Sequence, residues 1–232
     1  MTDKDTETYQ NYVLARDEEV VNGAKHYTAL ECYNNENGAS RPYQISESVE
    51  MEILYNYYYE NSSSDENNYS VCVIFNQGDN HYLFTGDLEE DGERYLVEYN
   101  DLPECVLFKA GHHGSGTSSN DFLLEVIKPK YVIICTCAGS SQYTDNNDNQ
   151  FPYQSLIDRI AQYTDQVYIT SVVDNYVDHN EWNSSGTIKS MNGNIVFSVS
   201  NGEVSIECSN NNLILKNTEW FKEHRICPVE WV

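Results

Sequence analysis

The sequence predicts a mixed α/β fold (α+β in its arrangement), with helices and strands packed around one main sheet. Three observations favour it. The chain has 232 residues, enough for one sizeable hydrophobic core. Hydrophobic residues make up 40% of it and aromatic residues 12%, as in folded globular proteins. Strand-like runs alternate with helical patterns in the middle of the chain and pair as hairpins at its flanks, which is typical of helices covering a sheet.

The N-terminal part is predicted from local composition. Residues 1–25 indicate a polar helix without a clear apolar stripe, and residues 33–50 indicate a loop. The run MEILYNYYY at 51–59 has strand composition, and the polar stretch ENSSSDENN after it indicates a turn. YSVCVIFNQ and HYLFTGD, separated by the turn residues Gly-Asp-Asn, then predict a β-hairpin.

Helices and strands alternate regularly in the middle of the chain. The apolar runs CVLFKAG, YVIICTC and QVYITS predict three buried strands, and a helix is predicted before each. The first helix is DLEEDGERYLVEY. The second follows the capping pattern of Ser118 and Asp121 and stops at Pro129, and the third begins at Pro152. From Gly186 onward, GTIKSM, NIVFSV, EVSIEC and LIL predict an antiparallel meander.

The charge of the chain limits its partners. Its 37 acidic and 13 basic residues give a formal net charge of −24. The negative electrostatic field of such a charge repels the phosphate backbones of nucleic acids, so nucleic acid is disfavoured as a direct ligand. The simplest explanation of the many acidic residues is that they keep the protein soluble. No apolar run approaches the roughly 18 residues of a membrane span, and the polar N-terminus does not resemble a secretory signal.

The seven cysteines include no Cys-x-x-Cys motif, and most lie inside apolar runs. This pattern predicts buried free thiols and a cytoplasmic protein, with an extracellular location left open if a leader precedes Met1. Cys135 and Cys137 share one face of a predicted strand, so a thiolate metal pair is a further alternative.

Three potential metal ligands follow predicted strands. Asp87 closes HYLFTGD, and His112 and His113 follow the strand that ends in Phe-Lys-Ala-Gly. Adjacent strand ends of an α/β sheet form the crevice where ligands bind, so these side chains are expected in one pocket. A carboxylate with imidazoles suits Zn²⁺ or Mn²⁺. The alternative is an ordinary polar turn with nothing bound.

Four stretches resemble the C-terminal half of a metallo-β-lactamase-fold domain of the ComEC competence-protein type. They are NNYSVCVIF (67–75), FTGDLEEDGE (84–93), FKAGHHGSGTSSNDFLLEVIKPKYVII (108–134) and SSGTIKS (184–190). The combination of Thr-Gly-Asp with Gly-His-His-Gly-Ser about 25 residues later is the specific part. The expected organisation is one domain over 1–232, with 65–200 matching the family, a poorly defined part at 1–64, and C-terminal strands and tail at 201–232.

The resemblance implies an αββα sandwich with a dinuclear metal site at the sheet edge. Asp87 then matches the bridging aspartate, and His112 and His113 match the histidine pair, one a metal ligand and the other a ligand or substrate contact. Ser115 and Thr117 match hydroxyl positions that orient the loop or contact substrate. The implied activity is metal-dependent hydrolysis of a phosphodiester or other ester.

Two departures from the family pattern weaken that activity for this chain alone. The His-x-His-x-Asp-His cluster, which supplies most ligands, does not occur, so the chain is expected to begin downstream of it. The family's Gly-His-Pro reads Gln150-Phe151-Pro152 here. The alternatives are therefore a non-catalytic binding or scaffold domain, or one half of a split hydrolase. A homo-oligomer, or an N-terminal half-domain as partner, is expected because half a sandwich leaves an apolar sheet face uncovered.

Overall fold

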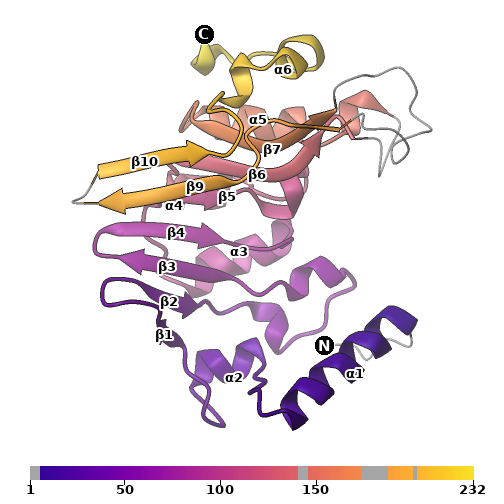
Figure 1. Cartoon of the computed structure of the whole chain (residues 1–232), viewed down its shortest axis with the longest axis vertical. Helices are drawn as coiled ribbons and strands as arrows, with labels where there is room; N and C mark the ends of the chain where they lie inside the picture. The colour runs from indigo at the N-terminus through magenta and orange to yellow at the C-terminus, as the bar shows by residue number, and fades with distance from the viewer. Residues whose placement is uncertain (1–5, 141–145, 174–187, 201–202) are drawn as a thin grey trace.

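The computed structural model describes residues 6–140, 146–173, 188–200 and 203–232. Its centre is an eight-stranded sheet whose strands lie side by side in chain order (Figure 1). The strands are β1 (Pro42–Gln44), β2 (Glu50–Ile53), β3 (Val73–Gln77), β4 (Asn80–Phe84), β5 (Leu107–Lys109), β6 (Tyr131–Ala138), β7 (Val167–Val173) and β8 (Ile188–Ser190). Neighbours are antiparallel from β1 to β4, parallel from β4 to β7, and antiparallel again between β7 and β8. The predicted mixed α/β class is confirmed.

Three helices connect the parallel strands. They are α3 (Glu90–Tyr99) between β4 and β5, α4 (Asp121–Ile127) between β5 and β6, and α5 (Gln154–Ala161) between β6 and β7. Because all three crossovers advance in the same direction and such crossovers are right-handed, they belong on the same face of the sheet. Their apolar residues join alternate sheet residues such as Leu83, Phe108 and Ile134 in the main hydrophobic core. This packing fixes where the loops after β4 and β5 emerge.

The opposite face of the sheet is partly covered by a separate hairpin of β9 (Ile195–Ser200) and β10 (Glu203–Cys208) (Figure 1). The Phe197 ring packs edge-on against Tyr82 and Tyr131, with centroids 5.7 and 5.3 Å apart. An apolar groove of about 640 Å³ remains between hairpin and sheet, and Phe84 and Ile133 are among its lining residues. The two faces of the main sheet are therefore covered to different extents.

The ends of the chain add smaller elements. Helix α1 (Glu7–Val21) buries no residue, in keeping with its predicted polar character. Helix α2 (Ala29–Asn34) packs Cys32 with Ala39 and Ile53 in a second, small core cluster. Helix α6 (Glu219–His224) contributes its aromatic residues to the main core.

Several local predictions were wrong. The single meander predicted from Gly186 onward does not form, because β8 pairs with β7 in the main sheet while β9 and β10 form a separate sheet. The strand predicted over 51–59 is β2 alone, because the Asn56 side chain accepts a hydrogen bond from the Tyr58 amide and starts a short 3-10 turn at Tyr57–Tyr59. The loop predicted over 33–50 contains β1, and the segment LIL leads into a 3-10 turn at Leu215–Asn217 instead of forming a strand. Residues 184–187, at the start of the last family-like stretch, lie outside the described residues.

The cysteines only partly match the prediction of buried thiols. All seven are free, but three are buried, two are half-buried, and Cys135 and Cys227 are exposed. In the part of the chain that the structure describes, no helix combines the length and apolar character needed to cross a bilayer.

Candidate functional site

The turn after β4 places Asp87 at the edge of the sheet. Gly86 has a φ of +61°, in the left-handed region, and a Cβ there would lie 2.9 Å from Oγ of Ser70. The same Ser70 hydroxyl accepts a hydrogen bond from the Asp87 amide at 3.0 Å. Glycine is thus required for the chain to turn tightly against Ser70, and this turn directs the Asp87 side chain, which is 38% exposed.

The turn after β5 carries the two histidines. β4 and β5 are adjacent and parallel, so their carboxyl ends meet, and the His112 amide donates to the carbonyl of Gly86 at 3.0 Å. His112 and His113 have φ values of +44° and +54°, which are uncommon for residues with a side chain. Such strain costs on the order of 1–3 kcal/mol per residue and persists only where surrounding contacts determine the conformation. The sequence prediction that Asp87 and the histidines lie at neighbouring strand ends agrees with this geometry.

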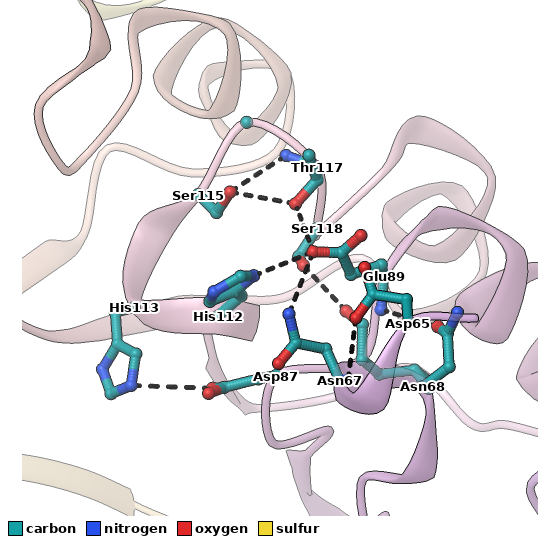
Figure 2. A network of polar contacts seen from close by, with 12 residues as sticks. Asp65, Asn67, Asn68, Asp87, Glu89, His112, His113, Ser115, Thr117 and Ser118 are labelled. Carbon is teal, nitrogen blue, oxygen red and sulfur yellow. Dashed lines mark hydrogen bonds and ion pairs between the residues drawn. The ribbon is translucent and has the colours of Figure 1, made fainter. Parts of the chain in front are cut away.

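His113 faces Asp87 (Figure 2). Its Nε2 lies 3.6 Å from Oδ1 of Asp87, while its Nδ1 lies 2.8 Å from the carbonyl oxygen of Cys135. A carbonyl oxygen can only accept, so Nδ1 must carry a proton and donate. In the neutral ring Nε2 is then an acceptor that faces a carboxylate, which is also an acceptor. A proton on Nε2, a metal cation between the two atoms, or a water molecule that donates to both would resolve this conflict.

His112 faces a different carboxylate, that of Glu89 (Figure 2). Its buried Nδ1 lies 3.2 Å from Oε1 of Glu89 without making a hydrogen bond. The same oxygen accepts hydrogen bonds from Asn67 and Thr117, each at 3.2 Å. The ring of Phe151 lies 6.1 Å from the His112 ring, centroid to centroid. Although His112 and His113 are adjacent in sequence, they belong to two separate carboxylate–imidazole pairs.

Glu89 is the residue of this site that sequence reasoning missed. Glu89 stands two residues after Asp87, in a motif that the sequence analysis had singled out, and this position could have identified it. However, an acidic residue just before a helix is usually explained by the favourable interaction of negative charge with the first turn of that helix. What marks it out is the contact with His112, which depends on the fold.

The hydroxyls of Ser115 and Thr117 lie within the loop itself. Ser115 is buried, and its Oγ lies 2.9 Å from Oγ1 of Thr117 and accepts from the Thr117 amide at 3.2 Å. Thr117 in turn donates to Glu89. These contacts fit the expected role of Ser115 and Thr117 in orienting the loop. Contact of either hydroxyl with a substrate stays a prediction.

The described residues fit the implied dinuclear metal centre only in part. Among them, no three His, Cys, Asp or Glu side chains converge as a metal-binding group. The pair of Asp87 and His113 supplies two donors. Zinc bonds of about 2.1 Å at tetrahedral angles place two ligand atoms about 3.4 Å apart, close to the 3.6 Å between these two. Catalytic zinc commonly has three protein ligands, so this set alone falls short of the implied centre. His179 lies outside the described residues.

No family model matches the chain. It is similar to Recombination protein 2 of Haemophilus influenzae, with 31% identity over 107 residues, and to ComE operon protein 3 of Bacillus subtilis, with 28% identity over 107 residues. It is also similar to Competence protein ComA of Neisseria gonorrhoeae, with 31% identity over 102 residues. The matches cover 46, 46 and 44% of this chain but only 12, 13 and 14% of the respective relatives. The likeness to competence proteins is therefore limited to a short part of much longer polypeptides.

Proposed function

We propose that this chain carries part of a metal-dependent hydrolase site, acting on a phosphodiester or another ester, in a protein with a role in DNA uptake. The DNA-uptake role is suggested by the names of the similar competence proteins. With a net charge of −24, the chain is not expected to hold the DNA backbone itself. A divalent cation in such a site activates water and stabilises developing negative charge.

The arrangement of His113 carries the proposal. Its Nδ1 is committed to the Cys135 carbonyl, so the ring presents Nε2 to Asp87. A backbone carbonyl that fixes the tautomer of an imidazole in this way is the usual outer partner of a metal-binding histidine. The chain's own residues thus hold a carboxylate and an oriented imidazole together at the sheet edge. The further ligands that a complete centre needs are proposed to come from outside the described residues.

The alternative is a domain that keeps the loop without catalysis. One observation favours it: Phe151, where the family pattern has a histidine, packs its ring near His112. The Glu89 carboxylate that contacts His112 also accepts hydrogen bonds from Asn67 and Thr117. On this side of the site, the groups that could bind a second metal are already in contact with other groups of the protein.

Calorimetric titration of the full chain with Mn²⁺ and with Zn²⁺ distinguishes the two. Weak binding is expected, and Asp87→Ala and His113→Ala should each abolish it. Asp79→Ala and His26→Ala, exposed residues outside the site, should leave it unchanged. Binding by the wild-type chain that the two site variants leave unchanged, or no binding at all, would favour the non-catalytic alternative.

Activity provides a second test. The chain alone is expected to show no turnover of bis-p-nitrophenyl phosphate with added Mn²⁺, because the described donors are too few. Chelator-sensitive hydrolysis that disappears in Asp87→Ala would show that this chain completes the site by itself.

A further inference from the structure

The loop from Gly111 to Asn120 is closed on itself by local hydrogen bonds. The Gly111 amide donates to Oγ of Ser119 at 3.0 Å, and the Ser118 hydroxyl donates to the carbonyl of Leu88 at 2.7 Å. These bonds join the two ends of the loop and attach it to the segment after β4. Neither bond is made by His112 or His113, so the left-handed backbone of the two histidines also depends on other contacts around the loop.

A buried carboxylate binds the loop from the side of α3. Glu93 is fully buried and accepts from the backbone amides of Ser119 and Asn120 and from the Asn120 side chain. Gly111 leaves room for Ser118, since a Cβ at position 111 would lie 2.9 Å from Cβ of Ser118, whereas its distance of 3.5 Å from Oε1 of Glu93 would be an ordinary contact. Burial raises the pKa of Glu93 to about 7, while these donors and Arg159 act in the opposite direction.

A guanidinium binds the same loop from the side of α5. Arg159 donates to the carbonyl oxygens of Gly116, Ser118 and Ser119, at 3.0, 2.9 and 2.9 Å. The carboxylate therefore binds amide groups and the guanidinium binds carbonyl groups of one short segment. Bonds to ionised groups are roughly twice as strong as those between neutral groups.

We infer that Glu93 and Arg159 are positioning residues that clamp the loop and thereby orient the imidazoles of His112 and His113. The hydrogen bonds of both side chains go to residues 116–120, so each acts on the histidines through this segment. The clamp itself depends only on these contacts. Its relevance to metal binding rests on the proposed function.

The reason for using charged groups lies in the geometry. Three donors converge on Glu93, and three acceptors converge on Arg159. A glutamine at 93 would direct its own N–H groups toward some of these donors, and a lysine at 159 lacks the planar fork that reaches several carbonyls. Near-isosteric substitutions should therefore loosen the loop without removing a large side chain from the core.

Amide hydrogen exchange in the full chain, at about pH 8 where Glu93 is ionised, tests the clamp. In Glu93→Gln and Arg159→Lys, exchange of residues 111–120 should rise by about tenfold or more, while the amides of β6 and β7 stay protected. Glu90→Gln removes the same charge from an exposed position in the first turn of α3 and is the matched control.

Two further readouts separate positioning from a general loss of structure. The imidazole NMR signals of His112 and His113, assigned with His112→Asn and His113→Asn, should shift and broaden in both clamp variants and not in Glu90→Gln. Mn²⁺ affinity should fall in the same two variants. If wild-type protein binds no Mn²⁺, the proposed function fails, but the exchange and imidazole readouts still decide the clamp.

Unchanged exchange of 111–120 together with unchanged imidazole signals in a folded Glu93→Gln or Arg159→Lys protein would overturn the inference. If Glu93→Gln does not fold, Arg159→Lys decides, because it keeps the positive charge at the half-buried position 159. The inference would also be overturned if every folded clamp variant lost protection in β6 and β7 as well as in the loop. That result would mean that Glu93 and Arg159 stabilise the whole fold and not the loop in particular.

Discussion

The two carboxylate–imidazole pairs at the sheet edge differ in how fully the protein occupies them. Asp87 and His113 are 38 and 44% exposed and face each other at 3.6 Å. Glu89 and His112 are 22 and 24% exposed, and Glu89 also accepts from two neighbours. The same two chemical groups thus form an open pair, for which metal binding is proposed, and an enclosed pair that joins two loops.

The largest expected difference between the pairs is in metal binding. His113→Ala should abolish Mn²⁺ and Zn²⁺ binding, because it removes one of the two donors identified among the described residues, whereas His112→Ala should retain most of it. Isothermal titration calorimetry on the two variants measures this. Equal losses in both would mean that the two histidines share one site and that the division into an open and an enclosed pair is wrong.

A smaller effect is expected on stability. Glu89→Gln should lower the free energy of unfolding by about 1–2 kcal/mol, because the amide replaces a charged acceptor of the Asn67 and Thr117 hydrogen bonds. Differential scanning calorimetry measures it against Glu90→Gln, whose exposed ion pair with Arg94 is worth only a few tenths of a kcal/mol. Metal binding should survive in Glu89→Gln. A loss as complete as in Asp87→Ala would contradict a structural role for Glu89.

The smallest effect is expected from opening the enclosed pair. Phe151→His places an imidazole where the aromatic ring now packs near His112, and it should raise Zn²⁺ affinity by about tenfold at most. Phe151→Leu, which adds no ligand, is the control. Identical affinities in the two variants would show that position 151 is out of reach of a metal held by Asp87 and His113.

Much of the framework could be predicted from the sequence. Apolar runs with helical segments between them specify parallel strands, and right-handed crossovers then place Asp87 and the histidines at the carboxyl ends of two neighbours, as observed for β4 and β5. The predictions failed where apolar composition was the only signal. Residues 54–59 read as strand, yet Asn56 starts a turn there through a hydrogen bond of its side chain.

The sequence by itself determined the types of the site residues and their places at strand ends, because these follow from hydrophobic periodicity and from glycine turns. Only the tertiary structure decided which histidine faces which carboxylate and which acidic residues hold the loop. His113 is oriented by the carbonyl of Cys135, 22 residues away, and the loop backbone is bound by Glu93 and Arg159 from two different helices. Adjacent side chains in a left-handed turn point in different directions, so partners this distant along the chain become visible only once the sheet and its helices have packed.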